Sequence, residues 1–147
     1  MVVHLPFERT IKILNGYKDG DTVALCSVGY NRDKHCMGIV NFGATLHVLG
    51  KHKFSLTWDN DFLGFCKLDV CDMERVIVDE DTKAEQIIGF ESDKPRLMMM
   101  FKEYIQNEVD ALNERLTVRH KELDDILTGE VEEANVKPVI RERYRFM

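Results

Sequence analysis

The chain has 147 residues, of which 44% are hydrophobic and 31% are charged, close to the averages of soluble globular proteins. This balance excludes a collagen-like, low-complexity or fully disordered chain, and a chain of this length can bury a sizeable core as one domain. Its formal net charge of −6 disfavours non-specific binding to nucleic acid over the whole surface.

The N-terminal residues lack the basic stretch, apolar core and cleavage site of a signal peptide. No apolar run reaches the roughly 18 residues of a membrane helix. Val2 and Tyr144 stand where N-myristoylation and prenylation would require a glycine and a cysteine. These observations predict a cytoplasmic protein without a membrane partner.

The cysteine spacing favours free thiols. Of the four cysteines (Cys26, Cys36, Cys66 and Cys71), only the last two approach the paired spacing that is typical of zinc sites. Cys26 and Cys66 fall inside apolar runs, where a thiol behaves as a small hydrophobic side chain. We therefore expect mostly inaccessible free cysteines, with a zinc site or disulfides as the less favoured alternatives.

A short helix is predicted for residues 6–14. Pro6 suits the first turn of a helix, and Phe7, Ile11 and Leu14 recur at helical spacing on one face. Asn15 and Gly16 provide a stop.

From Thr22 onward the pattern changes to short apolar runs separated by Gly, Asn and Asp turns about every 8–12 residues, which is typical of antiparallel strands. The segment 49–53 predicts a hairpin loop. We expect an α+β fold in which residues 1–94 form a small β-rich domain, a small antiparallel sheet or an open barrel. The expected strands are Thr22–Val28, Met37–Phe42, Thr45–Leu49, Phe54–Trp58, Phe62–Leu68, Val76–Val78 and Gln86–Phe90.

Residues 95–128 are predicted to form one long amphipathic helix, because no helix breaker stands between Pro95 and Gly129. Its apolar residues recur in alternating steps of four and three, as in a coiled coil. Such a stripe needs a second helix, and a symmetric pair is the commonest closed solution. We therefore expect a homodimer whose interface contains Ile105, Val109, Leu112, Leu116, Arg119, Leu123 and Ile126.

Arg119 is the one polar residue among these seven positions. A guanidinium buried without a partner would be costly, so it must pair with a carboxylate or reach solvent. Glu122 lies three residues further on. We expect Arg119 to bridge to a carboxylate at the helix–helix seam and to specify the pairing.

The helix opens with five consecutive apolar residues, Leu97 to Phe101, three of them methionines. Together they cover all sides of a helix, which predicts that this end packs onto the sheet domain on every side. A partner-binding surface is the alternative, because methionine adapts to irregular contacts.

Residues 129–147 form an acidic turn followed by a basic tail. Arginine pairs with phosphate and stacks on bases, and aromatic side chains on a strand offer stacking surfaces. The alternatives are a tail docked on the acidic stretch 122–133, or a solvated tail. The candidate contacts to a partner or to nucleic acid are Phe54, Trp58, Arg141, Arg143, Tyr144 and Arg145.

The sequence contains no complete catalytic motif, so we expect no enzyme, no cofactor and no metal site. Its small size, acidity and single amphipathic helix resemble, in general type, small accessory proteins of phages and mobile elements. The leading hypothesis is a non-catalytic, homodimeric protein-binding module that occupies a partner's surface, such as an inhibitor of a nucleic-acid enzyme or of a host defence protein. The alternatives are a nucleic-acid-binding protein, disfavoured by the acidic charge, and a virion or scaffold component.

Overall fold

The computed structural model describes residues 6–58 and 67–129. The chain divides into two compact units, residues 1–107 and residues 108–147. Within the described ranges, the first unit contains a short helix, a six-stranded antiparallel sheet and the beginning of a long helix, which confirms the α+β prediction.

The described elements follow the predicted order along the chain. The helix α1 has the predicted bounds, Pro6–Leu14, and the long helix α2 covers Lys94–Thr128. The strands are β1 (Thr22–Asn31), β2 (Cys36–Gly50), β3 (Lys53–Thr57), β4 (Lys67–Asp69), β5 (Val76–Val78) and β6 (Glu85–Phe90). There are also two single 3-10 turns. The first, η1 (Val70–Asp72), lies between β4 and β5, and the second, η2 (Glu91–Asp93), lies between β6 and α2.

The strand β2 corrects one prediction. Two separate strands were expected over 37–42 and 45–49, but the structure forms one strand through Gly43 and Ala44, because the long β1 pairs with it residue by residue. The predicted hairpin at 49–53 is confirmed, with Gly50 paired to Lys53.

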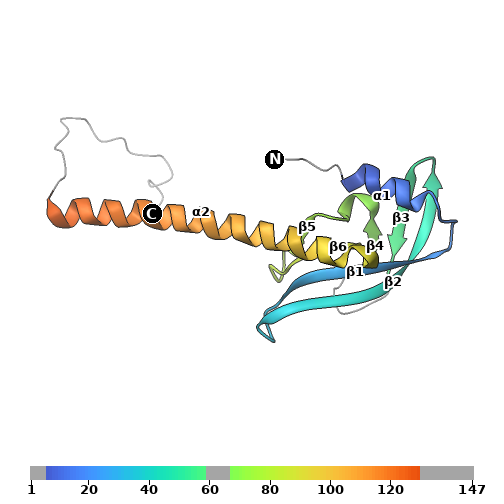
Figure 1. The fold of residues 1–147 in the computed structure, drawn as a ribbon, viewed down its shortest axis with the longest axis horizontal. Helices are drawn as coiled ribbons and strands as arrows, with labels where there is room; N and C mark the ends of the chain where they lie inside the picture. Colours follow the sequence, from blue (N-terminus) through green and yellow to red (C-terminus); the bar gives the residue numbers. More distant parts are fainter. Residues whose placement is uncertain (1–5, 59–66, 130–147) are drawn as a thin grey trace, which may run out of the picture. The chain divides into compact units, whose positions relative to one another are not determined.

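The strand order is β4-β3-β2-β1-β6-β5, so the sheet is not a simple meander. The first four strands follow one another as neighbours, and the β5–β6 hairpin then adds to the free side of β1. The chain therefore crosses from one edge of the sheet to the other between β4 and β5. The strands form a curved half-barrel (Figure 1). This confirms the prediction of a small antiparallel sheet or an open barrel.

Both faces of the sheet are covered where β1 and β6 meet. Leu25 and Ile88 belong to the larger core cluster with Leu14 of α1, whereas their chain neighbours Cys26 and Ile87 pack with α2. Adjacent residues of a strand point to opposite faces, so α1 and the beginning of α2 cover opposite faces of the sheet.

The beginning of α2 contacts the sheet on one side only. Leu97 and Phe101 are buried, whereas Met98 and Met99 are exposed, so the prediction that every side is covered is wrong. Leu97 and Phe101 lie four residues apart and share one helix face, and this face alone meets the sheet.

The covered part of α2 extends several residues into the helix. Met100 and Ile105 still pack against the cluster around Leu97, and the first unit ends at residue 107. The β-rich domain was expected to end at residue 94, before the helix. The first turns of α2 belong to that domain because they complete its second core cluster.

Among the described residues, no helix is long and apolar enough to cross a membrane.

Candidate functional site

The predicted stripe of α2 is exposed beyond Ile105. Ile105 itself is partly buried and packs against the sheet cluster. We call the remaining apolar positions the α2 stripe. Its members, each between 42% and 67% exposed, are Val109, Leu112, Leu116, Leu123 and Ile126.

These positions follow one side of a regular helix. Steps of three and four residues keep successive side chains within about 50° of one line, because an α-helix turns 100° per residue. A shallow groove extends from this side onto the flank of the helix, and it is lined by Ala111, Leu112, Glu114, Arg115, Leu116, Val118, Arg119 and Glu122. The stripe and the charged residues beside it thus form one continuous surface.

Arg119 is paired within its own helix. Its Nη1 donates to Glu122 Oε2 at 2.9 Å, and its side chain is 81% exposed. The predicted carboxylate partner is therefore present, and the guanidinium of the single chain is in solvent rather than buried. An exposed i,i+3 pair stabilises a helix only slightly, by about 0.3–0.5 kcal/mol. The role predicted for Arg119 at a seam between two helices remains a prediction.

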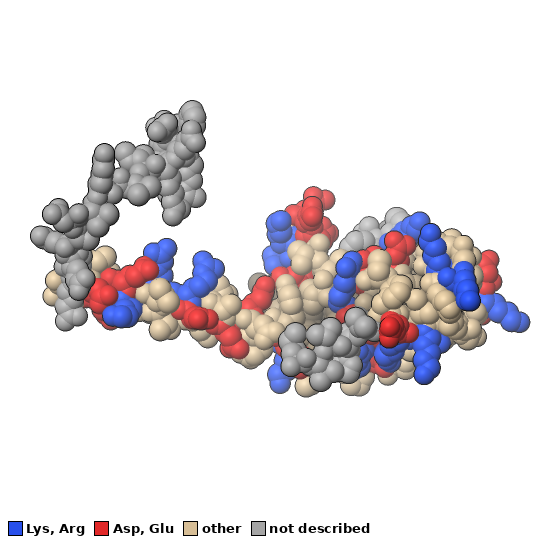
Figure 2. All heavy atoms as spheres, turned by 90° about the horizontal axis from the view of Figure 1, so that it is seen from above, with Lys and Arg blue, Asp and Glu red and all other residues tan. Residues whose placement is uncertain are grey.

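The charges along residues 108–128 are mixed in sign. Figure 2 shows acidic and basic side chains interspersed along the exposed part of α2. Lys121 pairs with Asp125 at 3.3 Å, one turn further along the helix. A partner surface that fits this helix must therefore match a pattern of charges rather than a single sign.

Two of the predicted contact residues are in the core. Phe54 is 9% exposed and Trp58 is 7% exposed, and the Trp58 ring stacks on Phe42 with the ring centroids 4.0 Å apart. Their spacing was interpreted correctly as one face, but that face is the buried one. The prediction that they offer a stacking platform to nucleic acid is wrong, because bases cannot reach them.

The other predicted contact residues lie outside the described residues. They are Arg141, Arg143, Tyr144 and Arg145.

An ion cluster around the buried Glu74 was missed by the sequence analysis. The Glu74 side chain is fully buried and pairs with Arg9 of α1 and with Arg96 of α2, whose Nη1 lies 2.7 Å from Glu74 Oε1. Arg9 also pairs with Asp93 of η2 at 2.5 Å. Two positive and two negative charges therefore meet where α1, the segment after η1 and the beginning of α2 come together.

Glu74 is held by its backbone as well as by its charge. Its φ of +56° lies in the left-handed region, which is uncommon for residues other than glycine, and its N–H donates to Ile88 O at 2.6 Å. Glu74 Oε2 is buried without a hydrogen-bond partner among the described residues. This costly arrangement fixes the first turn of α2 on the sheet. The only sequence signal for it is an acidic residue after a run of strand residues, which is too common to be specific.

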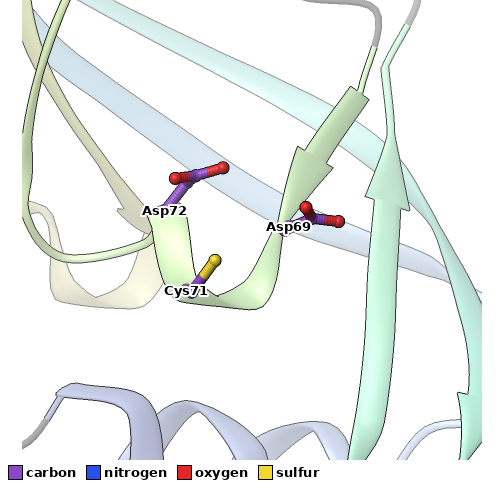
Figure 3. A group of neighbouring side chains, drawn as sticks. All are labelled: Asp69, Cys71 and Asp72. Atoms are coloured by element: carbon purple, nitrogen blue, oxygen red, sulfur yellow. The ribbon is translucent and has the colours of Figure 1, made fainter.

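A group of potential metal ligands consists of Asp69, Cys71 and Asp72, whose donor atoms lie within 4.8 Å of one another. Figure 3 shows Cys71 and Asp72 on the η1 turn and Asp69 at the end of β4. Asp72 already pairs with Arg75. Asp69 and Cys71 are exposed, so water competes for these groups, and the enclosure that is typical of structural zinc sites is lacking here.

An open pocket of about 550 Å³ lies against β1, β2 and β6. Its floor includes Ser27 and Gln86, both buried, and the Ser27 hydroxyl donates to Gln86 Oε1 at 3.1 Å. An amide has no basic atom that could take the proton of a serine hydroxyl, so this pair does not activate a nucleophile. Asp79 at the rim accepts backbone N–H groups of Asp81 and Thr82, which lower its pKa. It is a turn-forming carboxylate.

The three described cysteines are free, but their exposure differs from the prediction. Cys26 is buried, and burial raises the pKa of its thiol. Cys36 and Cys71 are exposed, so the expectation of mostly inaccessible thiols is wrong for these two. Cys36 begins β2, and Cys71 is the middle residue of the η1 turn. Cys66 lies outside the described residues.

Comparison with protein-family models, with curated protein sequences and with solved structures gave no match.

Proposed function

We propose that the chain is a non-catalytic protein-binding module that pairs with a second copy of itself through the α2 stripe. One observation carries this proposal: apolar side chains at coiled-coil spacing are exposed along the helix from Val109 to Ile126. Soluble proteins rarely leave a continuous apolar stripe in water, and a stripe with this period fits a second helix.

The energetics allow a pair that depends on concentration. Full burial of a leucine, valine or isoleucine stabilises by about 1.5–3 kcal/mol, and each member of the stripe is close to half exposed. Covering the stripes of two chains then contributes roughly 8–15 kcal/mol, against an association cost of about 4–15 kcal/mol. A dimer at micromolar concentrations is within this range.

We further propose that the dimer acts by occupying the surface of another protein. The net charge of −6 supports a partner with a basic surface, because opposite charge speeds encounter. A basic site that normally holds nucleic acid is the specific form of this proposal, which makes the chain an inhibitor of a nucleic-acid enzyme. The burial of Phe54 and Trp58 removes the main support for direct binding to nucleic acid.

The pairing is tested by light scattering at tens of micromolar. We expect a mass twice that of the 17.1 kDa chain, and a return to 17.1 kDa for Leu116→Asp, which places a charge in the seam. Thr117→Asp is the matched control, since Thr117 is also exposed but lies off the stripe and outside the lining of the groove. A wild-type mass of 17.1 kDa at this concentration would contradict the pairing.

A salt titration against single- and double-stranded oligonucleotides tests the competing function. We expect no binding at 50–200 mM salt. Binding that weakens steeply with rising salt would favour a nucleic-acid-binding protein instead, because release of counterions from phosphates gives that dependence.

A further inference from the structure

The charged residues beside the α2 stripe hold information about how two copies pair. We propose that the helices of the dimer run antiparallel, with the point midway between Thr117 and Val118 at the twofold axis. This inference rests on the proposed pairing and deepens it: the partner is a second copy of this chain, held in one orientation and one register.

A parallel pair is disfavoured by Arg119. In a parallel coiled coil, equal core positions face each other, so Arg119 would lie against Arg119 of the second copy. Two like charges would then meet in a seam that is otherwise apolar, which destabilises it. Arg115 would face His120, and Glu122 would face Leu127, so the flanking positions form no ion pair between the two chains.

An antiparallel pair separates the two arginines. The a positions of the heptad are Val109, Leu116 and Leu123, and the d positions are Leu112, Arg119 and Ile126. In this orientation each a position faces a d position of the second copy. The residues directly before the a positions, which are Glu108, Arg115 and Glu122, face one another. With the axis between Thr117 and Val118, Leu116 faces Arg119, Leu112 faces Leu123, and Val109 faces Ile126. Every member of the α2 stripe is then covered, and the methylene stem of Arg119 lies along Leu116 while its guanidinium reaches the edge.

The flanking charges select this register. It places Arg115 opposite Glu122 of the second copy, and by symmetry it does so twice. Glu122 already accepts Arg119 of its own chain at 2.9 Å, which holds the carboxylate beside the seam where a second arginine can reach it. Arg115, Arg119 and Glu122 all line the same groove beside Leu112 and Leu116.

The neighbouring registers bring like charges together. A shift of one heptad in one direction places Arg115 opposite Arg115 and Glu108 opposite Glu122. The shift in the other direction places Glu122 opposite Glu122. Leu112 and Val109 then lie beyond the last described turn of the second copy's helix, so the described part of that helix does not cover them. Only the proposed register combines a fully covered stripe with complementary charges.

A charge-swap experiment tests the register in the full-length chain. Arg115→Glu and Glu122→Arg each replace both attractive contacts by repulsive ones, so we expect each variant alone to dissociate about tenfold more readily than the wild type at low salt. When the two variants are mixed, each glutamate again faces an arginine. Native mass spectrometry should then show the heterodimer in excess over both homodimers.

Two control variants change the same charges away from the seam. Lys121→Glu and Asp125→Arg each break an ion pair outside the lining of that groove, and we expect them to dimerise as the wild type does and to mix without preference. Loss of the heterodimer preference at 1 M salt, where the Debye length is about 3 Å, would support an electrostatic origin.

The outcomes separate the register from the pairing. A wild-type dimer with a statistical mixture of the two swap variants overturns the antiparallel register but leaves the dimer intact. A wild-type chain that stays monomeric in the same instrument overturns both proposals, because the stripe would then be covered by another segment of the chain or by a different partner.

Discussion

Gly89 of β6 and Leu97 of α2 pack so closely that a Cβ atom at residue 89 would lie 2.7 Å from Leu97 Cδ2. The close approach lets Leu97 enter the second core cluster at 0% exposure. The absence of a side chain at Gly89 thereby sets how deeply the first turn of α2 sits on the sheet.

Gly89→Ala should therefore be destabilising, by about 1–3 kcal/mol in urea unfolding, because the buried side chain of Leu97 must shift within a packed cluster. Gly38→Ala is the matched control, since a Cβ there meets no atom closer than 3.6 Å. If the two variants lose the same stability, the contact with Leu97 does not limit the packing of α2.

Glu74→Gln should destabilise the fold by about 1–3 kcal/mol. The substitution leaves Arg9 and Arg96 without their shared carboxylate while keeping the shape of the side chain. Arg75→Ala, which removes an exposed pair with Asp72, is expected to change stability by less than about 0.5 kcal/mol. An equal effect of both variants in urea unfolding would show that the buried cluster adds no more than a surface pair.

The described cysteines should differ in reactivity. Cys36 and Cys71 are exposed and should be alkylated by iodoacetamide in the native protein, whereas Cys26 should react only after unfolding, because the thiolate is the reactive form and burial both hides it and raises its pKa. Peptide mapping by mass spectrometry gives the order. Native labelling of Cys26 as fast as that of Cys36 would contradict the burial of Cys26.

Asp79 should make stability depend on pH in the acid range. Backbone N–H groups of Asp81 and Thr82 hold its folded pKa below the unfolded value of about 3.9. Its contribution is therefore present above the unfolded pKa and is lost as the pH falls through the folded pKa. The difference in Tm between the wild type and Asp79→Ala should be largest near pH 7 and should shrink below about pH 4.

Asp81→Ala is the control for that series. It keeps the backbone N–H that Asp79 accepts and removes a carboxylate from the same turn. A Tm difference for Asp79→Ala that is the same at pH 3 and pH 7 would mean that the ionised carboxylate adds nothing to stability.

Arg119→Leu should raise the thermal stability of the assembly and broaden its states. The exposed Arg119–Glu122 pair contributes little within one helix, whereas a leucine would make the seam apolar along its whole length and would remove the charge that disfavours parallel pairing. Native mass spectrometry reports the distribution of masses. An unchanged distribution would show that Arg119 is only a solvated residue beside the stripe.

Local patterns in the sequence were sufficient for the two helices. Pro6, the helical spacing of Phe7, Ile11 and Leu14, and the stop at Asn15 define α1 at its observed bounds, because a helix is closed by hydrogen bonds between residues four apart. The same argument gave α2, where Gly129 follows the last turn with a φ of +73°. The coiled-coil spacing of the α2 stripe also came from the sequence alone.

The tertiary structure alone decided what covers each element. No local pattern indicated that the β5–β6 hairpin would join the free side of β1, because strand pairing depends on contacts between distant residues. That pairing puts a sheet beneath Leu97, buries Glu74 between two arginines, and ends the covered part of α2 near Ile105. A period of two or of 3.6 residues says which side chains share a face, but the burial of Trp58 and the exposure of Leu116 depend on which element meets that face.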